Sequence, residues 1–245
     1  MIEFIQATKR YGRSDRNALD HLNLKVGDGC VYGFLGPNGA GKTTAIRLLT
    51  GALRPTDGEI RVNGISVTEK PIDAKRMIGF VPDSQEMYER LTGVEYLNFM
   101  ADIFGVSEAD RRERADKYLA RFDMAEAARD RIGSYSRGMK QKIAAIGALI
   151  HEPPVWVLDE PMVGLDPRAA FLLKEEMRER ANAGATVFFS THVLEVAEKL
   201  CDRVGIIHKG KLIMEGTPEE LLGKTGDASL EEVFLEMTAS AQENA

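Results

Sequence analysis

The sequence GPNGAGKT, residues 36–43, fits the pattern G-x-x-x-x-G-K-[ST] at every fixed position. The apolar run VYGFL before it, residues 31–35, predicts a short buried strand, and residues 43–50 after it predict a helix. Glycines let the turn between them point successive backbone N–H groups toward one place, where the helix N-terminus adds partial positive charge. This arrangement binds phosphate groups, so the stretch predicts a nucleotide site. A glycine-rich turn with a chance lysine would lack this strand and helix context.

Two side chains of this loop have distinct predicted roles. Lys42 places a point charge on the β- and γ-phosphates of a nucleotide, and the Thr43 hydroxyl is suited to bind Mg²⁺. We expect the nucleotide to be held by Gly36, Pro37, Asn38, Gly39, Ala40, Gly41, Lys42, Thr43 and Thr44.

A second apolar run ends in two carboxylates. VWVL, residues 155–158, predicts a buried strand, and Asp159 and Glu160 follow it directly. In a parallel sheet the end of this strand lies beside the phosphate-binding turn. Asp159 is therefore predicted to hold the Mg²⁺ shell, and Glu160, which points elsewhere, to polarise an attacking water. The alternative is an ordinary surface turn after a strand.

The length of 245 residues, with 44% hydrophobic and 29% charged residues, is typical of a globular protein with a substantial core. A net charge of −6 argues against a protein that coats nucleic acid. The apolar run at residues 143–150 is far shorter than the roughly 20 residues needed to span a membrane. Two cysteines, Cys30 and Cys201, are too few for a disulfide framework and favour a reduced, intracellular compartment.

The stretch SYSRGMKQK, residues 134–142, narrows the class of nucleotide-binding protein. It begins an amphipathic helix at Met139, and one apolar face of this helix contains Met139, Ile143, Ile146 and Ile150. The stretch resembles the signature motif of ABC (ATP-binding cassette) ATPases, whose consensus is LSGGQ, and matches it at Ser136 and Gly138. A small-molecule kinase with the same phosphate loop would not explain these two residues.

The resemblance covers essentially the whole chain and implies further site residues. Tyr11 looks like the aromatic side chain that stacks on adenine, with a simple packing role as the alternative. The run Gly164, Leu165, Asp166 resembles the loop that crosses to the other subunit, and His192 resembles the histidine that contacts the γ-phosphate.

One element departs from the family pattern. Members of the family normally have a glutamine directly after the sequence Ile-Gly-Tyr-Val-Pro. In this chain the corresponding residues 78–82 are followed by Asp83, and the first glutamine, Gln85, lies two positions further on. Asp83 is favoured as a ligand of the Mg²⁺ shell, since an oxygen ligand suits that ion. The alternative is that Gln85 reaches the site through a longer loop.

Strands that alternate with helices predict an α/β fold with a mainly parallel sheet. The resemblance implies a P-loop NTPase (RecA-like) core with an N-terminal antiparallel β subdomain and an inserted α-helical subdomain. We expect a single ABC ATPase domain, in which residues 1–91 and 153–215 form the β and RecA-like core and residues 92–152 the helical subdomain. Residues 216–245 form a C-terminal helical tail, with predicted helix starts at Thr217 and Ser229.

The family resemblance implies an ATPase that uses ATP and Mg²⁺ and forms a head-to-tail dimer closed by ATP. We expect a homodimer, with a heterodimer formed with a related ATPase as the alternative. The chain resembles ATPases that are paired with type-2 ABC (exporter) permeases. The expected partner is therefore a separate polytopic membrane permease, which would hold this chain at the cytoplasmic face of the cell membrane. A groove near residues 83–91, with Tyr96, Phe99, Met100 and Phe104, is the candidate permease contact, although these aromatic residues also suit the core. Alternatives are a soluble ABC ATPase acting on nucleic acid or ribosomes, against which the negative charge argues, and an importer ATPase.

Overall fold

The computed structural model describes residues 1–12, 16–83, 86–225, 232 and 234, and a six-stranded sheet lies at its centre. The strand order is β10-β9-β3-β8-β7-β6, in which β10 is antiparallel to β9 and the other five strands are parallel. The strands are β3 (Val31–Leu35), β6 (Ile78–Val81), β7 (Val155–Asp159), β8 (Thr186–Thr191), β9 (Arg203–His208) and β10 (Lys211–Gly216).

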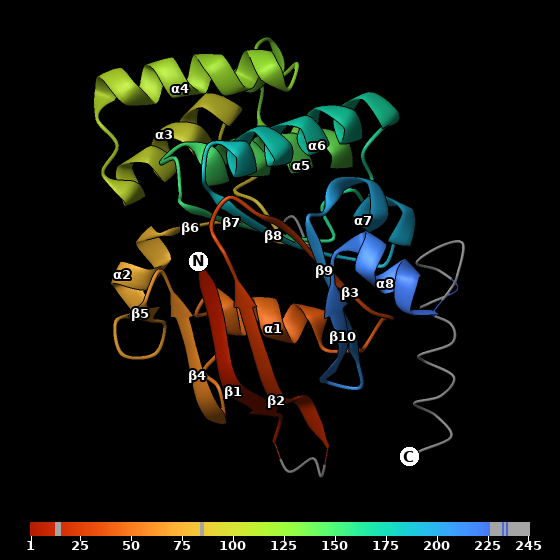
Figure 1. Cartoon of the computed structure of the whole chain (residues 1–245). Coiled ribbons are helices and arrows are strands. Elements are labelled where there is room, and N and C mark those ends of the chain that lie inside the picture. The colour runs from red at the N-terminus through yellow and green to blue at the C-terminus, as the bar shows by residue number, and fades with distance from the viewer. Residues whose placement is uncertain (13–15, 84–85, 226–231, 233, 235–245) are drawn as a thin grey trace.

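A second, antiparallel sheet is formed largely by the N-terminal segment, in the order β2-β1-β4-β5. Its strands are β1 (Ile2–Arg10), β2 (Asn17–Val26), β4 (Asp57–Val62) and β5 (Ile65–Ser66). The helix α1 (Lys42–Leu49) packs between this sheet and the central sheet in one shared apolar cluster (Figure 1).

The other helices follow the order that the sequence predicts. Figure 1 shows α3, α4, α5 and α6 together on the side of the central sheet away from α1. The segment between β6 and β7 holds α3 (Gly93–Phe104), α4 (Glu108–Arg121) and α5 (Arg137–Leu149), with 3-10 turns at Ala127–Arg129 and Ile132–Ser134. The remaining helices are α2 (Pro71–Arg76), α6 (Pro167–Asn182), α7 (Leu194–Leu200) and α8 (Pro218–Thr225).

Local sequence signals begin several of these helices. Thr92 forms a reciprocal capping box with Glu95 at the start of α3. Ser107 accepts a hydrogen bond from the backbone of the first turn of α4, and Thr217 pairs with Glu220 before α8. The predicted start at Thr217 is therefore confirmed, whereas the one at Ser229 lies outside the described residues.

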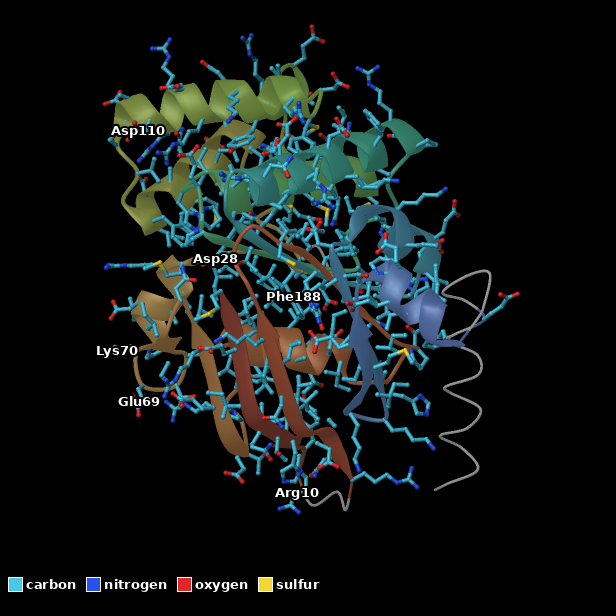
Figure 2. The ribbon with its side chains drawn as sticks, in the orientation of Figure 1. Arg10, Asp28, Glu69, Lys70, Asp110 and Phe188 are labelled. Atoms are coloured by element: carbon cyan, nitrogen blue, oxygen red, sulfur yellow. The ribbon has the colours of Figure 1, made fainter. Side chains whose placement is uncertain are left out.

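The central sheet is buried on both faces because helices cover one side and α1 with the second sheet covers the other. Along β8, Phe188, which is labelled in Figure 2, packs with Tyr32 and Phe34 in the apolar cluster that includes α1. Its neighbours Val187 and Phe189 instead belong to the cluster formed with the helices on the other side. Continuous apolar strands are typical of such two-sided burial. The predicted α/β class, the mainly parallel sheet, the antiparallel N-terminal sheet and the helical insertion are thus confirmed.

Among the helices described, none is both long enough and apolar enough to cross a membrane.

Cys30 and Cys201 are free thiols, and burial raises the pKa of the Cys30 thiol to about 11. Neither cysteine is therefore an activated nucleophile at neutral pH.

His151, just after α5, makes the stability of the fold depend on pH. Its ring stacks on Phe104 with centroids 3.6 Å apart, and burial lowers the pKa of His151 from 6.5 to about 4. Between these pH values the unfolded chain binds a proton that the folded chain does not. Stability from this group is therefore complete above pH 6.5 and is lost as pH falls toward 4, by about 3 kcal/mol in all.

We predict that His151→Leu removes this part of the pH dependence. The measurement is the free energy of unfolding in urea at pH 7, 5.5 and 4.5, followed by the fluorescence of Trp156, the single tryptophan, which is fully buried. The wild type should lose more stability than the variant between pH 7 and 4.5. Equal losses in the two proteins would show that His151 is not the group responsible.

Candidate active site

A hollow of about 220 Å³ lies at the carboxyl end of the central sheet, where β3 leads into α1. The predicted phosphate loop, the second residue after β6 and the residue directly after β7 all contribute to its wall. The lining residues are Ala18, Pro37, Asn38, Gly39, Gly41, Lys42, Thr43, Thr44, Asp83 and Glu160. Sequence positions as far apart as 18 and 160 therefore meet at one site.

The loop keeps its shape because two of its glycines approach backbone carbonyl oxygens of other segments. A Cβ atom on Gly36 would lie 2.4 Å from the Ile207 oxygen, and one on Gly41, where φ is 114°, would lie 2.6 Å from the Ala18 oxygen. Real Cβ atoms do not approach so closely, so both positions require glycine. Gly36 and Ala40 do not line the hollow; Gly36 lies against the strand β9, and Ala40 contacts the turn after it.

The turn at Gly210, which the sequence analysis did not connect with the site, supports the phosphate loop. The Gly210 N–H, between β9 and β10, donates to the Ala40 oxygen at 2.8 Å. The Gly210 oxygen in turn accepts from the Asp20 N–H at 2.9 Å. The phosphate loop is thereby tied to β2 and to the last two strands of the central sheet. A glycine in a hairpin turn was visible in the sequence, but its partner was not.

The Lys42 ammonium lies between the loop and the end of β7. Its Nζ donates to the Gly36 oxygen at 2.6 Å and lies 3.3 Å from Glu160 Oε1, and both side chains are largely buried. Glu160 Oε2 is 2.9 Å from Nδ1 of His192. The side chain of Glu160 thus contacts both Lys42 and His192. The sequence predicted all three as site residues, and they come from three separate segments of the chain.

Asp159 is buried at the end of β7, beside three other polar groups. Its Oδ1 accepts a hydrogen bond from Ser190 Oγ at 2.6 Å. Burial raises the pKa of Asp159, whereas hydrogen bonds from Ser190 and Thr43 lower it and the nearby Asp83 charge raises it. The Thr43 hydroxyl and the Asp159 and Asp83 carboxylates are oxygen donors of the kind that suits Mg²⁺, which commonly binds one or two protein carboxylates together with nucleotide phosphates.

Asp83, which the sequence analysis favoured as a ligand of the Mg²⁺ shell, is one of the residues that line the hollow. The alternative residue, Gln85, lies outside the described residues. Tyr11 does not line the hollow, but its hydroxyl is 3.3 Å from Thr44 Oγ1 and its ring is 45% exposed.

Ser136, Gly138 and Asp166 form a separate group. Ser136 caps α5 by accepting from the Met139 N–H at 3.2 Å, and Asp166 caps α6 by accepting from the Ala169 N–H at 2.9 Å. A Cβ atom on Gly138 would lie 3.3 Å from the Gly164 oxygen, so the starts of the two helices are packed together. Within the described part of the chain, none of the three residues lines the hollow.

The site combines a phosphate loop after β3, a buried aspartate followed by a glutamate at the end of β7, and a histidine that contacts this glutamate. These features together define a nucleoside triphosphatase of the P-loop class. Residues 19–163, more than half of the chain, match the model of the ABC transporter family. The chain belongs to this family and is an ATPase.

Relatives and solved structures agree with this assignment. The daunorubicin resistance ATP-binding protein DrrA3 of Streptomyces coeruleorubidus is 40% identical over 230 residues, which make up 94% of this chain and 72% of that protein. The solved structure of an ATP-binding subunit of an ABC transporter matches with a TM-score of 0.92 and 34% identity, covering 97% of this chain and 99% of the other. The dimeric structure of MJ0796, a bacterial ABC transporter cassette, matches with a TM-score of 0.81 and 26% identity over 89% of this chain and 98% of the other.

Proposed function

We propose that two copies of this chain bind ATP between them, head to tail, and that hydrolysis drives a membrane transporter. The observation that carries the proposal is the division of the site residues into two groups on one chain. The hollow holds Lys42 and Glu160, whereas Ser136, Gly138 and Asp166 lie together elsewhere. A two-fold axis would bring each group of one copy against the other group of its partner.

The size of the hollow supports this arrangement. Its volume of about 220 Å³ is below the roughly 300–1,000 Å³ of pockets that enclose a small ligand. A nucleotide held there needs a second wall, which the α5 N-terminus of a partner would supply with backbone N–H groups and the Ser136 hydroxyl. The dimeric cassette structure that this chain resembles is consistent with such a pair.

Each residue of the hollow has a role in hydrolysis in this proposal. The loop N–H groups and Lys42 bind the β- and γ-phosphates, and Glu160 orients the attacking water, with His192 holding its other carboxylate oxygen. Mg²⁺, held by Thr43 and Asp159 with Asp83 nearby, would neutralise charge on the phosphates. Tyr11 offers its exposed ring to the adenine, next to Thr44.

Glu160→Gln is expected to abolish hydrolysis while leaving ATP binding intact, because the amide cannot accept a proton but keeps the shape of the side chain. The ATPase kcat should fall at least about 100-fold. In light scattering the variant should form a stable dimer when ATP and Mg²⁺ are added and return to monomer without ATP. Wild-type turnover by the purified variant would contradict the role of Glu160, and an ATP-bound monomer would contradict the dimer.

We further propose that the chain acts at the cytoplasmic face of the cell membrane through a separate polytopic permease, and that the direction is export. The direction rests on the likeness to a drug-resistance ATP-binding protein. The proposed permease contact is an apolar patch of three exposed side chains: Tyr88 at 59%, Phe99 at 38% and Ile103 at 56%. The rings of Tyr88 and Phe99 are in edge contact, with centroids 5.3 Å apart.

This patch is connected to both halves of the ATP site. Tyr88 lies five residues after Asp83, and the neighbouring Glu89 forms an ion pair of 2.7 Å with Lys140 of α5. The Glu89 oxygen also accepts from the Gly133 N–H at 3.0 Å, just before the α5 N-terminus. In this proposal, these contacts couple ATP binding to the patch. Of the other predicted contact residues, Tyr96 is buried in the core and Phe104 stacks on His151.

We predict that the patch determines recovery of the permease from native membranes solubilised in detergent. Wild-type protein should recover a polytopic membrane protein in about equal amount, and Tyr88→Glu should lose it. Phe171→Glu is the matched control, because Phe171 is 58% exposed on α6 and lies outside the patch. Equal recovery by all three proteins would contradict the patch, and recovery of ribosomes or only soluble proteins would contradict the transport proposal.

A further inference from the structure

Ser190 joins the two carboxylates at the end of β7. It is fully buried on β8, where it lies opposite Asp159 in the register of the two parallel strands. Its Oγ donates to Asp159 Oδ1 at 2.6 Å and accepts from the Glu160 N–H at 2.9 Å. One hydroxyl therefore contacts both residues of the predicted acidic pair.

The direction of these two hydrogen bonds is fixed by the groups that make them. A carboxylate only accepts, and a backbone N–H only donates. A hydroxyl has one proton to give, so it must donate to Asp159 and receive the Glu160 N–H on a lone pair. The three groups thus form one ordered chain, and each bond in such a chain strengthens the next.

The backbone at Glu160 gives this contact a second consequence. Its φ is 48°, in the left-handed region that residues other than glycine seldom adopt. This turn of the chain points the Glu160 carboxylate at Lys42 and His192. The Ser190 hydroxyl accepts the hydrogen bond from the Glu160 N–H and so stabilises this backbone conformation. His192 lies two residues after Ser190 in the sequence.

We infer that Ser190 is a positioning residue for Mg²⁺ binding and for hydrolysis. It sets the direction of the Asp159 carboxylate toward Mg²⁺ and the direction of the Glu160 carboxylate toward the attacking water. The inference rests on the proposed roles of Asp159 and Glu160. Ser190 itself does not line the hollow and is not expected to contact ATP.

Ser190→Ala tests the inference, with Thr186→Val as the matched control. Thr186 is equally buried at the opposite end of β8, and its hydroxyl donates to the Gly27 oxygen at 3.1 Å, away from the acidic pair. Both substitutions remove one buried hydroxyl from the same strand. Trp156 fluorescence during thermal unfolding checks that each variant is folded.

We expect Ser190→Ala to lower kcat by about 10- to 100-fold and to raise the Mg²⁺ concentration for half-maximal binding of a fluorescent ATP analogue by about tenfold. The KM for ATP at saturating Mg²⁺ should change by less than about twofold, because Ser190 does not contact the nucleotide. Thr186→Val should match the wild type in kcat and in Mg²⁺ dependence. The binding measurement is independent of turnover.

The variants Asp159→Asn and Glu160→Gln separate the inference from the proposed function. If Asp159→Asn loses the Mg²⁺ dependence of binding and Glu160→Gln loses hydrolysis, while Ser190→Ala retains both, the inference about Ser190 is wrong and the proposed function stands. If Thr186→Val is impaired as much as Ser190→Ala, the inference is also wrong, since any buried hydroxyl of β8 would have that effect. If Asp159→Asn and Glu160→Gln themselves behave like the wild type, the proposed function is wrong.

Discussion

The ammonium group of Lys42 joins the two segments on which the rest of the site depends. It donates to the carbonyl of Gly36 in the phosphate loop and pairs with Glu160 at the end of β7. The ion pair between Lys42 and Glu160 can form because β3 and β7 are parallel strands of one sheet, so both strands end at the same edge. From Glu160 the connections continue to His192 and, through its backbone, to Ser190.

The sequence predicted those parts of the site that are encoded locally. The phosphate loop needs glycines, a lysine and a threonine at fixed spacing, and a carboxylate pair after an apolar strand has few other uses. The contact of Gly210 with Ala40 and that of Ser190 with Asp159 were not predicted, because they join segments 170 and 31 residues apart. The first is made by backbone atoms, which all residues have, and serine in a strand is too common to indicate a role.

Burial was also harder to predict than secondary structure. Tyr96 and Phe99 belong to the same helix and are both aromatic, yet one is buried against Gly147 and the other is partly exposed. Their spacing predicts the helix, whereas the packing of α5 against α3 decides which face is covered. The proposed permease patch therefore followed from the exposure of side chains in the structure. Asp83 lines the hollow, whereas Gln85 lies outside the described residues, so the choice between the two stays a prediction.

The central claim is that one chain carries two halves of different ATP sites, which meet only between two copies. The most direct test is a crystal or cryo-EM structure of Glu160→Gln protein with ATP and Mg²⁺. The account predicts two chains with two ATP molecules between them, each bound by Lys42 of one chain and by Ser136 and Gly138 of the other. ATP bound to a single chain, with Ser136 and Gly138 of every copy facing solvent, would contradict it.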